Sequence, residues 1–227
     1  MKLEGIDIVI EKTARRKTVS IFIERDGTVK VLAPVSADDK LIQTAVTAKQ
    51  YQIFLKLAKW KELNSGKVER QYVNGQSFLY LGRNYILNIV DEQDVPLKLS
   101  GGKFNLDRRN LDKPDTIFKN FYKEKGLEKI KERLPLIESK FNKRPASVKV
   151  QELQNRWASC TSAGALNFHW KCAMAPVAVL DYIITHELVH LIHPNHSPAF
   201  WDELDRVLPE YREHESWLKR NGVKMSL

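Results

Sequence analysis

A cluster of histidines near the carboxyl-terminal end constrains this chain more than any other feature. Four of its six histidines fall between His186 and His196, and none precedes His169. His186 and His190 are four residues apart, so on a helix both imidazoles lie on one face, one turn apart. A neutral imidazole is the commonest protein ligand for a divalent metal. The cluster therefore predicts a helix that carries a metal site.

The residues between and after this pair indicate a catalytic site. Glu187 completes a His-Glu-x-x-His motif, which places a carboxylate beside a metal-bound water. His196 follows His186 by ten residues, the offset of the third ligand in the long motif His-Glu-x-x-His-x-x-Gly-x-x-His, with His193 at the glycine position. Three protein ligands leave a fourth position open, which distinguishes a catalytic zinc site from a structural one.

The third ligand has alternatives besides His196, which the spacing favours. His193 lies on the same helical face as His190 and is the rival histidine. A carboxylate in this role would have to come from Glu203 or Glu210, downstream of the motif. Zinc suits a set of imidazoles best, and another divalent transition metal is the alternative.

One helix is expected to carry the motif, from Pro176 to His193. Proline suits the first turn of a helix, and Pro194 cannot continue the hydrogen-bond ladder. The apolar positions that give this helix a broad buried face are Val177, Leu180, Ile183, Ile184, Leu188, Leu191 and Ile192.

Composition sets outer bounds on the class of protein. The chain has 227 residues, 43% of them hydrophobic and 29% charged, which is typical of a globular protein. No apolar run approaches the ~20 residues of a membrane span, and the first residues lack the apolar core of a signal peptide. Cys160 and Cys172 are therefore expected as free thiols, and the location as cytoplasmic.

The net charge of +9 favours contact with nucleotides or nucleic acid, although a solvated basic surface is the simpler interpretation. The oligomeric state is not predicted.

Residues 1–110 are predicted to form an antiparallel β-rich region that includes a long helix. Three alternating segments, Ile6–Glu11, Val19–Glu24 and Val29–Leu32, indicate half-buried strands, with a tight turn at Asp26-Gly27. A helix is expected over residues 37–63, capped by Ser36. Two hairpins are expected within residues 71–106, with turns at 82–84 and 100–102.

Residues 111–227 are predicted to form the domain with the metal site. The polar stretch 107–115 is the expected boundary, and an amphipathic helix is expected over 116–141. Residues 147–150 and 165–172 alternate as strands do, and we expect 165–172 to be an edge strand that pairs with an extended substrate. The candidate donors to an oxyanion are Arg156, His169, Tyr211 and His214.

Several segments of this second half together resemble the YgjP-like branch of the SprT-type zinc metallopeptidases. They are Asn155-Arg156-Trp157-Ala158-Ser159-Cys160, the run from Asp181 to His190, and the run from His196 to Trp201. Order and spacing match over residues 147–205, with departures at Asn155, where the family usually has threonine, and Ala158, where it usually has glycine. The resemblance implies a zincin-like catalytic half with one zinc ion held by His186, His190 and His196, and Glu187 as general base.

We therefore expect an α+β zinc hydrolase whose metal-binding helix lies beside an edge strand, and whose substrate is a peptide or protein. One alternative is a metal-dependent nucleotide pyrophosphohydrolase, which phosphate contacts from Arg156 and Lys171 would favour. Another is a nucleic-acid-associated protein with a structural zinc. The presence of Glu187 argues against the latter, because a structural site has no use for a base.

Overall fold

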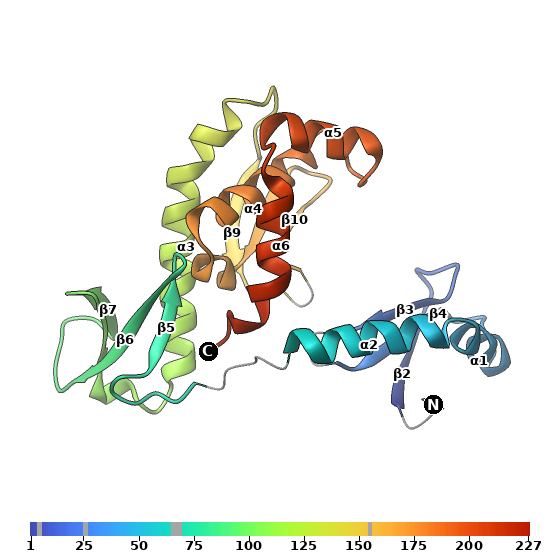
Figure 1. Ribbon diagram of the computed structural model, residues 1–227, viewed down its shortest axis with the longest axis horizontal. Coiled ribbons are helices and arrows are strands. Elements are labelled where there is room, and N and C mark those ends of the chain that lie inside the picture. The colour runs from blue at the N-terminus through green and yellow to red at the C-terminus, as the bar shows by residue number, and fades with distance from the viewer. Residues whose placement is uncertain (4–5, 25–26, 65–69, 154–155) are drawn as a thin grey trace. The chain divides into compact units, whose positions relative to one another are not determined.

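The chain forms two compact units, Met1–Gly66 and Lys67–Leu227, in a computed structural model that describes residues 1–3, 6–24, 27–64, 70–153 and 156–227 (Figure 1). The predicted boundary near residue 110 does not coincide with this division. The strands of residues 77–107 share one hydrophobic core with the metal-site half, so they belong to the second unit. Asp26 of the predicted turn and Asn155 of the family motif lie outside the described residues.

The first unit has a four-stranded mixed sheet in the order β1-β2-β4-β3. Its strands are β1 (Lys2–Leu3), β2 (Ile6–Thr13), β3 (Ser20–Ile23) and β4 (Val29–Pro34). β2 pairs with β4 in parallel and β3 pairs with β4 antiparallel. The three predicted strands are all present, each within two residues of its expected start and end.

Two helices, α1 (Asp39–Ala48) and α2 (Gln50–Asn64), occupy the span predicted as one long helix. Lys49 separates them. Asp38 caps α1 in place of Ser36, because its carboxylate accepts a 2.7 Å hydrogen bond from the Leu41 N–H. The helices and the sheet bury a separate small core, whose most buried members are Val29, Val31, Ala33, Ile42 and Val46.

The second unit begins with another mixed sheet, in the order β5-β6-β8-β7. Its strands are β5 (Ser77–Tyr80), β6 (Arg83–Val90), β7 (Leu97–Ser100) and β8 (Lys103–Asp107). Both predicted hairpins are present, with two-residue turns at Leu81-Gly82 and Gly101-Gly102. All four turn residues have positive φ, as this class of tight turn requires.

Helix α3 (Pro114–Glu138) follows a short 3-10 helix, η1 (Arg108–Asn110), and packs against both sheets of the second unit. It continues through Pro135 without a break. The Tyr122 hydroxyl donates a 2.6 Å hydrogen bond to the carbonyl of Leu79, which fixes α3 to β5.

The third sheet has the order β10-β11-β9, so the prediction of residues 165–172 as the edge strand is wrong. β11 (Ala165–His169) is central, between β9 (Ser147–Gln151) in parallel and β10 (Ala158–Cys160) antiparallel. Residues Trp170–Met174 form the 3-10 helix η2. The edge strand beside the helix that carries His186 is β10. Alternating polarity marks a strand but does not say how many neighbours it has.

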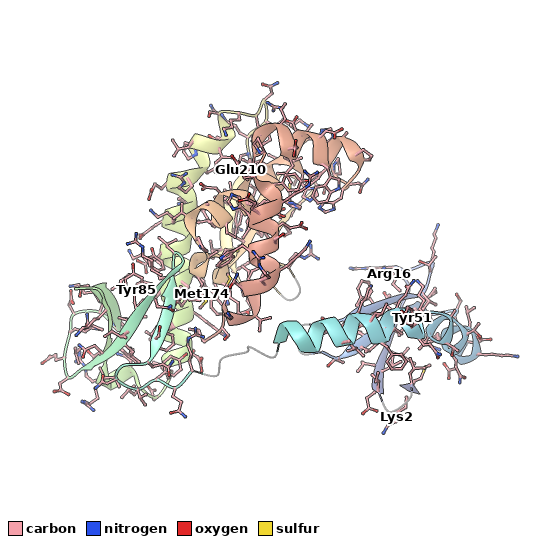
Figure 2. All side chains as sticks on the ribbon, in the orientation of Figure 1. Lys2, Arg16, Tyr51, Tyr85, Met174 and Glu210 are labelled. Carbon is pink, nitrogen blue, oxygen red and sulfur yellow. The ribbon has the colours of Figure 1, made fainter. Side chains whose placement is uncertain are left out.

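Three helices complete the second unit: α4 (Val177–Val189), α5 (Pro198–Val207) and α6 (Tyr211–Asn221), followed by the 3-10 helix η3 (Gly222–Lys224). The turn between β5 and β6 holds the start of α4, because the Gly82 N–H donates to the Met174 carbonyl at 3.0 Å. A Cβ at Gly82 would lie 2.8 Å from Cγ of Pro176, so no side chain fits there. Figure 2 labels Met174, whose carbonyl accepts the bond from Gly82, and Tyr85 on β6.

The α+β class is confirmed. In the described part of the chain, no helix combines the length and the apolar character that crossing a membrane requires.

Candidate metal centre

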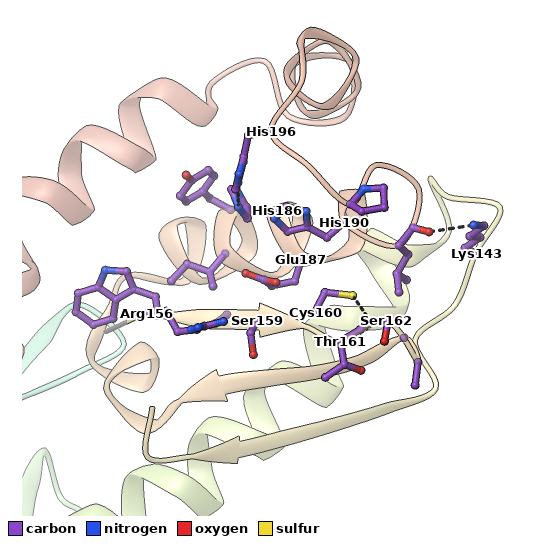
Figure 3. A pocket seen from close by; sticks show the side chains of 18 of the residues that line it. Lys143, Arg156, Ser159, Cys160, Thr161, Ser162, His186, Glu187, His190 and His196 are labelled. Atoms are coloured by element: carbon purple, nitrogen blue, oxygen red, sulfur yellow. Dashed lines mark hydrogen bonds between the residues drawn. The ribbon is translucent and has the colours of Figure 1, made fainter. Parts of the chain in front are cut away.

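Three imidazoles converge at the end of α4. His186 lies in its last turn, His190 is its C-cap, and His196 lies in the turn before α5. One potential ligand atom from each ring lies within 4.8 Å of the others, and the Nε2 atoms of His186 and His196 are 3.0 Å apart (Figure 3). The predicted histidine set is therefore assembled in space.

His193 enters this centre through its backbone. Nδ1 of His190 lies 3.1 Å from the His193 carbonyl oxygen, so a proton on Nδ1 leaves the Nε2 lone pair for a metal. This contact depends on the end of α4 at Val189, earlier than the predicted His193. The chain then turns, with the His193 N–H donating to Val189 at 2.9 Å. The side chain of His193 is not part of the cluster.

Helix α5 supports the three rings from one side. Phe200 is buried, and its ring centroid lies 4.6 to 4.9 Å from those of all three histidines. Trp201 stacks on His196 at 5.5 Å. Glu203, one of the two carboxylates predicted as alternative third ligands, instead accepts two hydrogen bonds from Arg206. Glu210 is exposed and is not part of the cluster.

The electrostatics of the cluster suit a cation. Burial lowers the pKa of His186 to about 3, with repulsion from His190 and His196 adding to the effect. Burial also lowers the pKa of His190. Both rings are therefore neutral at neutral pH, the form that binds a metal.

The spacing of the ring nitrogens also fits a metal ion. Tetrahedral zinc, with bonds of ~2.0–2.1 Å, holds its ligand atoms ~3.3 Å apart. The 3.0 Å separation of the His186 and His196 Nε2 atoms is close to this value. A set of three imidazole nitrogens is also one that zinc accepts at catalytic sites. The residues present therefore fit a bound divalent cation.

Glu187 lies between the histidines and β10, as Figure 3 shows. Its side chain is 5% exposed, and Oε2 has no hydrogen-bond partner among the described residues. Burial raises the pKa of Glu187 to about 7, while the positive charge of Arg156 and a hydrogen bond from the Cys160 backbone oppose the increase. A carboxylate with a pKa near 7 can both accept and release a proton at neutral pH.

The cluster opens into a pocket of about 920 Å³. One wall is α4, and the other is β10 together with the turn that follows it. Three basic side chains line this pocket: Lys143, Arg144 and Arg156.

Of the predicted oxyanion donors, only Arg156 lines the pocket. His169 is buried elsewhere, where Nδ1 accepts from the Lys171 N–H at 3.0 Å and Nε2 lies 3.3 Å from Glu152. Tyr211 is buried and stacks on Trp201, and His214 is not in the lining. Lys171 is also absent from the lining, and its ammonium lies 5.6 Å from the Trp170 ring centroid.

Two features of the lining were not predicted from the sequence. Tyr182 lines the pocket one turn before His186, and burial raises the pKa of its hydroxyl. The i, i+4 spacing from His186 could have identified it. Lys143 reaches the pocket because its ammonium donates a 2.9 Å hydrogen bond to the carbonyl of Leu191. The two residues are far apart in the sequence, so no local sequence pattern predicts this contact.

Comparison with known proteins gives one match. A family model described as a YgjP-like metallopeptidase domain matches residues 17–221. No curated protein and no solved structure matches the chain. The matched residues include the three clustered histidines, Glu187 and all of β10.

Proposed function

Because the chain belongs to the YgjP-like metallopeptidase family, we propose that it is a zinc-dependent peptidase. His186, His190 and His196 hold the metal in this proposal, and Glu187 is the general base. The observation that carries it is the convergence of neutral imidazoles and a buried carboxylate with an unpartnered oxygen at one pocket. Family membership and the histidine cluster both support the coarser description, a hydrolase that uses a divalent metal.

A bound zinc ion would acidify a water molecule and polarise a carbonyl group. Glu187 would accept the proton from the water and pass it to the leaving amine. Its pKa near 7 suits both transfers, and the hydrogen bond from Cys160 orients the carboxylate. Tyr182 is the donor in the lining available to a developing oxyanion.

The substrate would bind along β10. This strand pairs with β11 on one side and is at the edge of its sheet on the other, so an extended peptide can be added there as a further strand. In this proposal Ala158–Cys160, and not residues 165–172, is the edge strand that pairs with the substrate. The nucleotide alternative is not favoured, because Lys171 lies outside the lining and cannot act together with Arg156 on phosphates there.

Metal content tests the ligand set. Elemental analysis of the wild type should give one zinc ion per chain. His196→Ala should weaken zinc binding by more than the ~10–100-fold typical of losing an outer-shell partner. His193→Ala is the matched control and should retain the metal, because His193 contributes only its backbone.

Hydrolysis of a peptide library and a panel of nucleoside triphosphates, measured on the same samples, tests the reaction. The wild type should cleave peptides and leave triphosphates intact. Wild-type protein that takes up no metal when supplied with zinc would remove the basis for the proposal. So would a His196→Ala variant that binds zinc as tightly as the wild type.

A further inference from the structure

We infer that the pocket selects peptide segments with acidic side chains on both sides of the cleaved bond. The inference rests on the proposed function and concerns the substrate class of the same site. Among the described residues, the lining contains three cations, Lys143, Arg144 and Arg156, and one carboxylate, Glu187. That carboxylate is buried, so the charge presented to a ligand is positive.

The three cations lie at the two ends of β10. Arg156 precedes the strand by two residues. At the other end, the Ala146 N–H donates 2.9 Å to the carbonyl of Gly164, which joins the segment containing Lys143 and Arg144 to the turn after β10. Figure 3 shows Lys143 and Arg156 at opposite ends of the pocket, with the histidines and Glu187 between them.

These cations are available to a ligand. Arg156 is exposed and has no hydrogen bond to another described residue, so its donors are open to a carboxylate. The Arg144 side chain is 85% exposed, and its Nε forms only a long ion pair, at 4.0 Å, with Glu138. Lys143 uses one N–H on Leu191, and an ammonium group has two more to donate.

The separation of the charges favours a peptide over a nucleotide. At ~3.3 Å per residue, the three residues of β10 span about 10 Å, and the cations lie beyond its two ends. Charges at both ends of such a span match carboxylates several residues apart on an extended chain. A triphosphate concentrates its charge at one place and would need converging cations.

Binding to the full-length Glu187→Gln protein, supplied with zinc, tests this selection without turnover. The probes are fluorescent peptides of one apolar sequence that carry glutamate, glutamine or lysine on both sides of the centre. The glutamate peptide should bind about tenfold more tightly than the glutamine peptide, the effect of a few partly exposed ion pairs, and the lysine peptide should bind least. The preference should weaken as salt is raised.

Charge-reversal variants locate the two ends. In the same Glu187→Gln background, Arg156→Glu should abolish the preference for glutamate on one side of the centre, and Arg144→Glu the preference on the other side. Lys103→Glu is the matched control, since Lys103 is exposed on β8, outside the pocket lining, and undergoes the same charge change. It should leave both preferences intact.

Three results would overturn the inference: equal affinity for the three peptides, a Lys103→Glu effect as large as that of the pocket variants, or tighter binding of ATP than of the glutamate peptide. The proposed function is judged separately, by metal content and by cleavage of the peptide library. A wild type that cleaves neutral and acidic peptides equally well would be a peptidase without this selectivity.

Discussion

Asp107 and Glu187 are both buried carboxylates of the second unit, yet their surroundings are opposite. Asp107 is 1% exposed and accepts hydrogen bonds from the side chain and backbone of Arg109 and from the backbone of Gln93. These bonds hold the pKa of Asp107 well below its usual range. Glu187 has one oxygen without a partner among the described residues, and burial raises its pKa.

Two histidines differ in the same way. Both ring nitrogens of His169 have partners, whereas Nδ1 of His186 has none among the described residues. Buried polar groups in native proteins almost always form hydrogen bonds, so an exception requires an explanation. Asp107 and His169 contribute to the stability of the fold. Glu187 and His186 both line the pocket, where a water molecule or a substrate would supply the partner that Glu187 Oε2 lacks.

Replacement of Glu187 should lower activity more than any other single substitution outside the three histidines. Glu187→Gln should lower kcat about a thousandfold, the usual contribution of a general base. It should not lower the urea midpoint or the zinc content, because the removed charge stabilises neither the fold nor the three imidazoles. Peptide hydrolysis, elemental analysis and urea denaturation measure the three quantities.

Glu203→Gln is the matched control for this change. Glu203 pairs with Arg206 at 2.8 Å and lies outside the pocket lining, so the variant should keep both zinc and activity. A Glu187→Gln protein with wild-type turnover, or a Glu203→Gln protein without metal, would contradict the assigned roles.

Asp107 should affect stability in a pH-dependent manner. Its folded-state pKa lies below the unfolded value of ~3.9, so its contribution is complete above about pH 5 and is lost as the pH falls through the folded value. Asp107→Asn should therefore lower the urea midpoint at pH 7, and the difference from wild type should shrink towards pH 3. Tryptophan fluorescence can follow the urea unfolding of the second unit at each pH, since four of the five tryptophans are in that unit. A difference that does not change with pH would show that the charge is not the cause.

Replacement of Glu152 should have the smallest effect, a small loss of unfolding free energy. Its carboxylate accepts a 2.8 Å hydrogen bond from Trp170 Nε1 and faces His169. Its side chain is 57% exposed, so water can replace part of what is lost. Glu152→Ala should cost about 0.5 kcal/mol of unfolding free energy with no change in zinc content. Calorimetry and elemental analysis test this, and loss of zinc would mean that the two histidine sites are coupled.

The candidate site was predictable from the sequence to the extent that it is local. His186, Glu187 and His190 occupy one helical segment, and the spacing to His196 limits the third position. The backbone role of His193 was not predictable, because it depends on α4 ending at Val189 before the proline is reached. Lys143 enters the pocket through a tertiary contact with Leu191, which has no local signature.

The fold shows the same limit. Strand alternation and turn residues identified β2, β3 and β4 of the first unit, but not the two-residue β1, and both hairpins of the second. They did not show that β11 is central and β10 is the edge, because pairing depends on segments distant in the sequence. The composition of residues 107–115 suggested a boundary, but α3 packs against the sheet before it and joins both sides in one core.

The contact of Gly82 with Pro176 has a consequence for folding kinetics. The three clustered histidines are close together in the sequence, but the start of α4, which carries the first of them, docks on a turn from the other end of the second unit. Contacts of such high sequence separation require a long loop to close and slow the search for the native state. During synthesis the β5-β6 turn is made before α4, so the surface on which the helix docks already exists when the histidines emerge from the ribosome.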